Sequence, residues 1–382
     1  AGPLRYICGV RKKKKNIVLQ NVRVDDYAAE GKSLARVDGK VIFMEGVVPG
    51  DLVDVRLLKN KKDWAEGMVL KIHEYSGERV KPFCSHFGVC GGCQWQMLPY
   101  EKQLQYKSKQ VADVLQRIGK VPLPPIQPIL GAAATRHYRN KIEYTFGNKR
   151  FLTKEEIGDE TINGTQDVAG FHAKGFFDKV VDIDTCYLQD EPTNAIRLFV
   201  KQLAITKGWP FYDIRNHTGF LRTMQVRLCQ TGELMVNIMV GEDDQEKIRI
   251  LMEAVKNEFP AITTLLYTVN LKWNDSLYDL EPVTYHGKGY VIEKLEDFQF
   301  KIGPKSFFQT NTKQGEELYK VTRDFAELSG TETVYDLYCG TGSIGIFVSE
   351  KAKKIIGVEM VEAAIEDAKE NAALNNLNST AF

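Results

Sequence analysis

The sequence predicts a multidomain α/β protein with an N-terminal OB-type β-barrel, a central α+β domain and a C-terminal Rossmann-like domain. Three observations support this fold class. Residues 16–76 show short apolar alternations broken by Gly, Pro and Asp, a pattern typical of strands and turns. Residues 121–302 mix strand-like and helix-like runs. Residues 303–382 follow the order helix, strand, glycine-rich turn, helix, strand, helix, which is the opening of a doubly wound sheet.

The composition is that of a globular protein without a membrane or secretory segment. Apolar residues make up 43% and charged residues 26% of 382 residues, and no apolar run is long enough to span a bilayer. Residues 1–15 form a basic leader that ends in R-K-K-K-K and has no apolar signal core. Seven cysteines in so long a chain indicate metal or catalytic chemistry in a reducing compartment, so we expect a cytoplasmic protein.

The net charge of +1 conceals an asymmetry. Residues 1–110 hold 20 Lys and Arg against 12 Asp and Glu, a balance of +8, and the remaining residues have a balance of −7. A basic N-terminal third favours a polyanionic partner, although a solvated lysine tail also explains the run at 11–15.

The barrel over residues 16–76 is predicted from four or five short strands. Closed barrels of this type bind single-stranded nucleic acid on a basic, aromatic face. Lys59, Lys61, Lys62 and Trp64 are the candidates for that face. The alternative is a barrel that only packs against its neighbours.

Residues 77–120 hold a cysteine-rich loop followed by an amphipathic helix. Leu104, Val111, Val114, Leu115 and Ile118 share one helical face, and Gly119 suits a helix end. The proline-rich run that follows leads into the central domain, where strands are expected at "KIEYTFG", "MQVRLCQTGELMVNIMV", "ITTLLYTVNL" and "FQFKIG", and a helix over 243–258.

The glycine-rich turn carries the pattern G-x-G-x-x-G at Gly340, Gly342 and Gly345. It follows a strand containing Asp336, and Glu359 ends the next strand. Glycines let the backbone approach a ligand, and the second carboxylate suits two ribose hydroxyls. NAD and S-adenosylmethionine both fit. Asp336 favours the methyl donor, and a turn without a ligand is the third possibility.

Three cysteines, Cys84, Cys90 and Cys93, have the spacing C-x5-C-x2-C. Zinc modules more often use two separated C-x2-C pairs, whereas three clustered thiolates and a distant one suit an iron–sulfur cluster. Cys186 is the best fourth ligand, because Cys229 has the pattern of a strand interior and Cys339 belongs to the glycine-rich turn. Zinc and an unmetallated loop remain alternatives.

Several longer motifs occur together in the chain. They are "VKPFCSHFGVCGGCQWQMLPYEKQLQYK", "HYRNKIEYTFG", "GFHAKGFFDKVVDIDTC", "KIGPKSFFQTN" and "DLYCGTGSIGI". With these motifs the chain resembles the bacterial RNA uracil-C5 methyltransferases, specifically the TRAM-domain, iron–sulfur subgroup that modifies 23S ribosomal RNA. The resemblance covers nearly the whole chain from about Asn16.

The resemblance implies specific site residues. It implies a 4Fe–4S cluster on Cys84, Cys90, Cys93 and Cys186, and S-adenosylmethionine held by Gln309, Tyr338 and Glu359 with the Gly340–Gly342 backbone close by. Ser343 stands where several relatives have Asn. The partner would be RNA, either 23S rRNA or, as in archaeal relatives with the same parts, tRNA. The protein would be a monomer that makes no membrane contact.

Two further residues, Arg139 and Lys141, are candidates for RNA contact, with a strand-surface ion pair as the alternative. The family's cysteine nucleophile adds to uracil C6 and a glutamate takes the C5 proton. No residue here matches either, so we expect both beyond Phe382, with only the N-terminal half of the methyltransferase domain in residues 303–382. We expect this chain alone to be inactive. The rival from another class is a non-catalytic RNA-binding metal module.

Overall fold

The computed structural model describes residues 17–153, 155–159 and 166–382. The basic leader predicted at 1–15 lies outside these residues. The chain divides into two compact units, one of residues up to Gly88 with Cys93–Gly131, the other of Val89–Gly92 with Ala132–Phe382. No helix in the described ranges has the length and apolar content needed to cross a bilayer.

The first unit contains a six-stranded sheet and one long helix. Its strands are β1 (Val18–Arg23), β2 (Asp26–Tyr27), β3 (Ser33–Val37), β4 (Lys40–Met44), β5 (Leu52–Asn60) and β6 (Trp64–Glu74), with the 3-10 turn η1 (Ala29–Gly31) between β2 and β3. Their order is β1-β5-β6-β4-β3-β2, and only β4 and β6 run parallel. Alternate side chains such as Val22, Ile42 and Val55 form the core.

The closed barrel expected from the sequence is not found in the described residues, and the sheet has six strands instead of four or five. β1 pairs with β5, and β2 pairs with β3. The edge strands β1 and β2 are separated by only two residues, Val24 and Asp25. The Val24 N–H donates to the Asp51 carbonyl, and the Asp25 N–H donates to the Leu34 carbonyl. The chain itself therefore joins the two ends of the sheet, and no β1–β2 ladder forms there.

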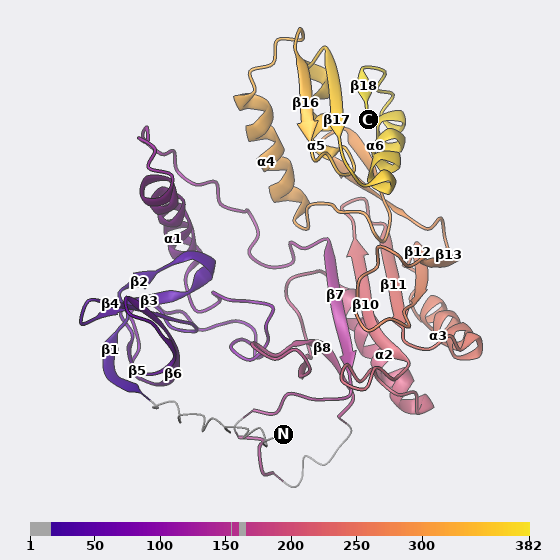
Figure 1. Cartoon of the computed structure of the whole chain (residues 1–382). Helices are drawn as coiled ribbons and strands as arrows, with labels where there is room; N and C mark the ends of the chain where they lie inside the picture. Colours follow the sequence, from indigo (N-terminus) through magenta and orange to yellow (C-terminus); the bar gives the residue numbers. More distant parts are fainter. Residues whose placement is uncertain (1–16, 154, 160–165) are drawn as a thin grey trace, which may run out of the picture. The chain divides into compact units, whose positions relative to one another are not determined.

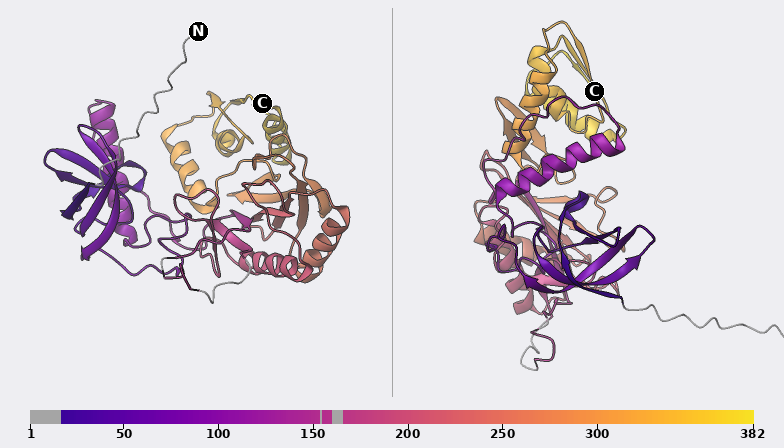
Figure 2. Two further views of the ribbon diagram at one scale, coloured as in Figure 1. Left: turned by 60° about the horizontal axis from the view of Figure 1, so that its bottom comes forward. Right: turned by 90° about the vertical axis from the view of Figure 1, so that its left-hand side faces the viewer.

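The predicted amphipathic helix is present as α1 (Tyr100–Asp113), which continues as the π-helical turn η2 (Val114–Ile118) (Figure 2). Aromatic packing holds the helix and the segment before it on the sheet. The ring centroid of Tyr27 lies 4.8 Å from that of Trp95, which precedes α1, and 4.7 Å from that of Tyr106 within the helix. The apolar face predicted farther along is exposed at Val114 and Ile118.

The second unit is built on a seven-stranded mixed sheet. The strands are β7 (Lys141–Gly147), β8 (Val168–His172), β9 (Val180–Asp182), β10 (Leu221–Leu228), β11 (Leu234–Val240), β12 (Thr264–Val269) and β13 (Val283–His286), in the order β13-β12-β11-β10-β7-β8-β9. The helices α2 (Thr193–Lys207) and α3 (Gln245–Glu258) pack apolar residues such as Val200 and Leu251 onto it (Figure 1). The predicted central α+β arrangement is confirmed.

The C-terminal part of this unit is a three-stranded parallel sheet with helices. A hairpin of β14 (Val291–Leu295) and β15 (Phe298–Ile302) leads to α4 (Thr312–Phe325). The chain then forms β16 (Thr333–Leu337), α5 (Ser343–Val348), the short turn η4 (Ser349–Lys351), β17 (Lys354–Val358), α6 (Glu362–Leu374) and β18 (Thr380–Ala381). The strand order β16-β17-β18 confirms the opening of a doubly wound sheet.

Candidate functional site

The loop that follows β16 uses left-handed backbone. Tyr338, Gly340 and Gly342 have φ angles of 61°, 54° and 75°, a region that glycine adopts freely and that strains a tyrosine. The Tyr338 side chain is 90% exposed, whereas Cys339 beside it is buried. The loop therefore presents its backbone and the Tyr338 ring at the carboxyl end of β16.

Two carboxylates hold this loop in place. Asp336 Oδ2 accepts a hydrogen bond from the Gly345 N–H at 2.8 Å, and Glu359 Oε2 accepts one from the Gly340 N–H at 3.1 Å. Burial raises the pKa of Asp336, whereas hydrogen bonds from backbone N–H groups lower the pKa of Glu359. Asp336 thus anchors the start of α5. Glu359 stays ionised and, with about four lone-pair directions, can still accept from a ligand hydroxyl.

The hydroxyl of Tyr319 connects the predicted residues Gln309 and Ser343. It lies 3.0 Å from Ser343 Oγ and interacts with the Gln309 side chain as well. Gly315, one turn before Tyr319, makes room, since a Cβ there would lie 3.0 Å from Gln309 Cβ. Residues from α4, α5 and the loop before α4 therefore meet at one point beside the glycine-rich turn. Sequence reasoning found Gln309 and Ser343 and missed Tyr319.

The four predicted metal ligands fall in both units, Cys84 and Cys93 in the first and Cys90 and Cys186 in the second. The loop cysteines are half-buried, and Cys186 is buried against the core of the second unit. Cys90 pairs with Ala173 in a β-bridge, and its Sγ accepts a hydrogen bond from the Gly92 N–H at 3.4 Å. An N–H donor of this kind suits a thiolate, so the donor chemistry fits the predicted group.

The structure does not show the predicted cluster. Within the described ranges, no group of three or more His, Cys, Asp or Glu side chains is arranged to hold a metal ion. Cys229, expected inside a strand, lies one residue beyond the end of β10, where its N–H donates to the Glu233 carbonyl in the β10–β11 turn.

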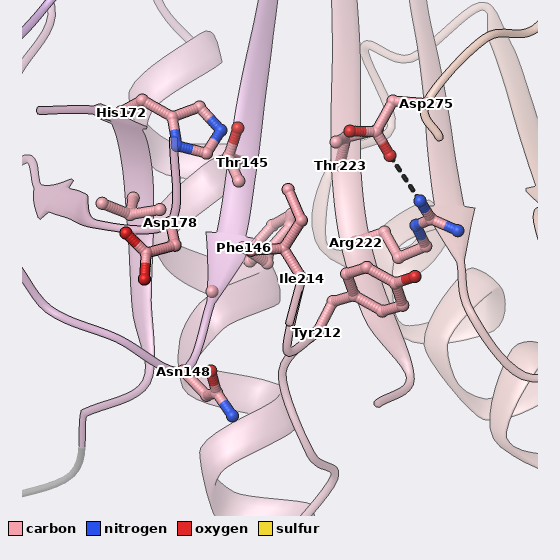
Figure 3. A pocket seen from close by; sticks show the side chains of 12 residues that line it. Thr145, Phe146, Asn148, His172, Asp178, Tyr212, Ile214, Arg222, Thr223 and Asp275 are labelled. Carbon is pink, nitrogen blue, oxygen red and sulfur yellow. Dashed lines mark hydrogen bonds and ion pairs between the residues drawn. The ribbon is translucent and has the colours of Figure 1, made fainter. Parts of the chain in front are cut away.

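A small pocket in the central sheet is lined by residues of β7, β10 and the neighbouring loops (Figure 3). Arg222 is buried there, forms an ion pair with Asp275 at 2.6 Å and lies over the ring of Tyr212. Burial lowers the pKa of His172, which favours its neutral form. The cavity volume of about 20 Å³ suffices for about one water molecule. This pocket is too small for a nucleobase.

Comparison with known proteins identifies domains in both units. Residues 18–70 match the TRAM domain family, and residues 328–382 match a family described as "methyltransferase domain". A crystal structure of the Pyrococcus abyssi tRNA (uracil-54, C5)-methyltransferase in complex with S-adenosyl-L-homocysteine resembles the chain with a TM-score of 0.71. It is 25% identical, and the match covers 95% of this chain and 78% of that one.

Two bacterial relatives match almost the entire chain. A protein of Bacteroides thetaiotaomicron described as an uncharacterized RNA methyltransferase is 48% identical, over 93% of this chain and 79% of its own length. A protein of Porphyromonas gingivalis with the same description is 45% identical, over 94% of this chain and 79% of its own length. The chain belongs to this RNA methyltransferase family.

In this member of the RNA methyltransferase family, the predicted RNA contacts of the first unit lie together on one hairpin. Lys61 and Lys62 are exposed in the turn between β5 and β6, and Trp64 begins β6. The Lys61 N–H donates to the Trp64 carbonyl at 2.9 Å, which closes the turn. Trp64, which is also exposed, and the two lysines therefore form a small basic, aromatic tip.

The two candidates of the second unit differ from each other. Lys141 forms an ion pair with Glu143 at 2.8 Å, which is the alternative that the sequence left open. The Nε of Arg139 is buried and has no hydrogen-bond partner among the described residues.

Sequence reasoning missed a buried polar network of Asn140, Thr312 and Glu293. Asn140 Nδ2 donates to Thr312 Oγ1 at 2.8 Å, and that hydroxyl donates to Glu293 Oε2 at 2.7 Å. Asn140 Nδ2 also donates to the backbone carbonyl of Gln309 at 2.8 Å. The network thus fixes the loop that carries Gln309 against β7. The asparagine stands in the "HYRN" motif, but that motif does not reveal partners so distant in sequence.

Proposed function

We propose that the protein methylates C5 of uridine in RNA with S-adenosylmethionine as the methyl donor. The observation that carries this proposal is the glycine-rich turn, with the ionised Glu359 hydrogen-bonded to Gly340 beside the exposed Tyr338. Membership of the RNA methyltransferase family supports it. The resemblance to a uracil-C5 methyltransferase whose crystal structure contains S-adenosyl-L-homocysteine supports the uracil and the methyl donor.

Residues of the turn and around it have separate roles in this proposal. Glu359 accepts hydrogen bonds from the ribose hydroxyls, the Gly340–Gly342 backbone lies against the donor, and the Tyr338 ring packs on it. Gln309 and Ser343, aligned by the Tyr319 hydroxyl, supply polar contacts at the other side. S-adenosylmethionine supplies an electrophilic methyl group.

The uracil base has to be activated before its C5 can accept the methyl group. Uracil C5 is a weak nucleophile until a thiolate adds to C6. The sulfur lone pair then forms the S–C6 bond, and the π electrons of the C5=C6 bond shift toward C5. The base must first leave its stack. The thiolate and the glutamate that removes the C5 proton have no assigned residue in this proposal.

A 4Fe–4S cluster on Cys84, Cys90, Cys93 and Cys186 is part of the proposal. Its support is the donor set of four thiols and the Gly92 N–H directed at Cys90 Sγ. Methyl transfer moves no electrons through a cluster, so we assign it a structural or RNA-docking role. The cytoplasmic location and the monomeric state also stay predictions.

Ribosomal 23S RNA is the first candidate substrate, and tRNA is the second. The named substrate of the Pyrococcus abyssi enzyme favours tRNA. The test is transfer of a labelled methyl group to unmodified 23S rRNA and to unmodified tRNA by the product of the complete gene, with the modified nucleoside mapped. We expect 5-methyluridine in one of the two. Tight binding of NAD without a response to S-adenosylmethionine would overturn the donor, and methylation at another base would overturn the reaction.

A further inference from the structure

A second pocket of the second unit, of about 410 Å³, lies outside the glycine-rich turn. Its walls are the segment 132–140, the β10–β11 turn and the first turn of α4. The residues that carry the argument are Ala134, Arg139, Asn140 and Lys313. The volume falls in the range of about 300–1,000 Å³ that is usual for ligand sites. None of the residues that we propose to hold the methyl donor lines it.

Asn140 supplies an unused hydrogen-bond acceptor in this wall. The residue is only 4% exposed, and both hydrogens of its Nδ2 are committed to the Gln309 carbonyl and Thr312 Oγ1. Its Oδ1 is buried and has no partner among the described residues. Buried polar atoms are rarely left in this state, so a ligand with an N–H donor would complete the site. Every nucleobase with a free pairing edge carries such a donor.

Two cationic side chains, Arg139 and Lys313, line the same pocket. The buried Nε of Arg139 has no hydrogen-bond partner among the described residues, and Lys313 lies at the N-terminal turn of the fourteen-residue helix α4. A helix N-terminus favours anions, and a guanidinium binds phosphate well. Asp190 also lines the pocket, and its Oδ1 lies 3.2 Å from His137 Nδ1. The pocket therefore combines an acceptor for a base with cations for a phosphate.

We propose that this pocket binds one nucleotide of the RNA substrate other than the uridine that is methylated. Its base donates to Asn140 Oδ1, and its phosphate faces Arg139 and Lys313. The inference rests on the proposed function, because it takes RNA as the substrate. Proteins recognise single-stranded RNA through bases turned out into such pockets.

The test uses a short fluorescein-labelled single-stranded RNA and fluorescence anisotropy. Ala134→Phe fills the pocket, and Arg139→Gln removes the cation. The matched control is Thr135→Phe, which adds the same ring at the next exposed residue, outside the lining. We expect Ala134→Phe to raise the Kd for RNA about tenfold, the order of one lost base contact. Arg139→Gln should weaken binding and reduce the slope of log Kd against log salt by about 0.7.

Two further measurements separate the possible outcomes. S-adenosyl-L-homocysteine binding, measured by calorimetry, should be unchanged in all three variants, which also confirms that they fold. AMP should compete with the RNA on the wild-type protein and lose this effect in Ala134→Phe. Wild-type RNA affinity in both pocket variants overturns the nucleotide site and leaves the proposed function intact. A wild-type protein that binds S-adenosyl-L-homocysteine but no RNA overturns the RNA substrate and this inference together.

Discussion

Glu359 Oε2 accepts a hydrogen bond from the backbone N–H of Gly340, with 3.1 Å between the two atoms. Oε1 of the same carboxylate accepts from the N–H groups of Val361 and Met360 at 3.0 and 2.8 Å. These N–H groups lower the pKa of Glu359 and keep it ionised at neutral pH. The Glu359 side chain thus joins the loop after β16 to the end of β17. The same backbone N–H groups that it joins keep its carboxylate ionised.

Replacing Glu359 with alanine should weaken binding of S-adenosyl-L-homocysteine. A hydrogen bond to a charged group contributes about 1.5–3 kcal/mol, so the Kd should rise roughly 10- to 150-fold. Isothermal titration calorimetry measures the change. Glu366→Ala, at an exposed position of α6, is the matched control and should keep the wild-type Kd. Equal affinities for both variants would contradict the assigned role of Glu359.

Gly345→Ala should destabilise the second unit. A Cβ at this position would lie 2.9 Å from Ile355 Cγ2 and 3.1 Å from Asp336 Oδ2. Overpacking of this kind typically costs about 1–3 kcal/mol, and urea unfolding measures the loss. Gly77→Ala is the control, because a Cβ there meets nothing within 4 Å and should change stability by less than about 1 kcal/mol. A loss no larger than the control's would show that the loop has room to adjust.

The strands of the central sheet could be predicted from sequence wherever the apolar pattern is regular, as over β7. The helix α2 was not predicted because Arg197 interrupts its apolar face. This arginine is fully buried, and its guanidinium donates to the Ala169 and Asp184 carbonyls at 2.9 Å each. A charged residue satisfied in this way has the sequence signature of a surface position.

In the candidate site, too, local contacts could be predicted from the sequence and long-range contacts could not. Gly340 and Glu359 lie 19 residues apart within one strand–turn–helix–strand motif, so the sequence pattern identifies both. Tyr319 lies 24 residues from Ser343, and Asn140 lies 169 residues from Gln309. Those contacts depend on how α4 packs and on how the loop before it meets β7. Neither relationship leaves a local pattern.

Thr312→Val should lower the free energy of unfolding by more than a substitution at the surface of the same helix does. The change keeps the shape but removes the hydroxyl that accepts from Asn140 Nδ2 and donates to Glu293 Oε2. Leaving a buried partner unsatisfied costs about 1–3 kcal/mol, so we expect a loss near the upper end. Urea unfolding measures it. Thr322→Val, at an exposed position of the same helix, should change the stability by no more than about 0.5 kcal/mol.

The stability of the Glu293→Gln variant, relative to that of the wild type, should increase as the pH rises. Burial raises the pKa of Glu293 above its ordinary value of 4.5, so the folded protein holds the proton more tightly than the unfolded chain does. That stabilisation is fully present below about 4.5 and is lost as the pH rises through the raised pKa. Glutamine carries no charge, so the free energy of unfolding of the variant, measured in urea, should gain on the wild type over this interval.

The exposed α4 position Glu317 supplies the control for this pH series. The free energy of unfolding of Glu317→Gln should stay close to that of the wild type over the whole pH series. If the free energy of unfolding of Glu293→Gln instead falls relative to that of the wild type as the pH rises, the raised pKa assigned to Glu293 is contradicted. It would mean that the hydrogen bonds from Thr312 and from the backbone N–H groups of Lys294 and Gln230, together with the charge of Arg227, outweigh the cost of burying the carboxylate.

Cys186→Ala should abolish or strongly reduce the iron content of protein purified without oxygen. Cys186 is buried, and its backbone N–H and carbonyl are both held by the Asn194 side chain. Removing its sulfur should therefore leave the backbone in place and withdraw a single thiolate from the proposed cluster. Metal analysis and the broad visible absorption of iron–sulfur proteins measure the loss, and Cys8→Ala, outside the proposed ligand set, should keep the wild-type iron content. Zinc in place of iron in the wild-type protein would refute the cluster, whereas iron retained by Cys186→Ala would show that another residue is the fourth ligand.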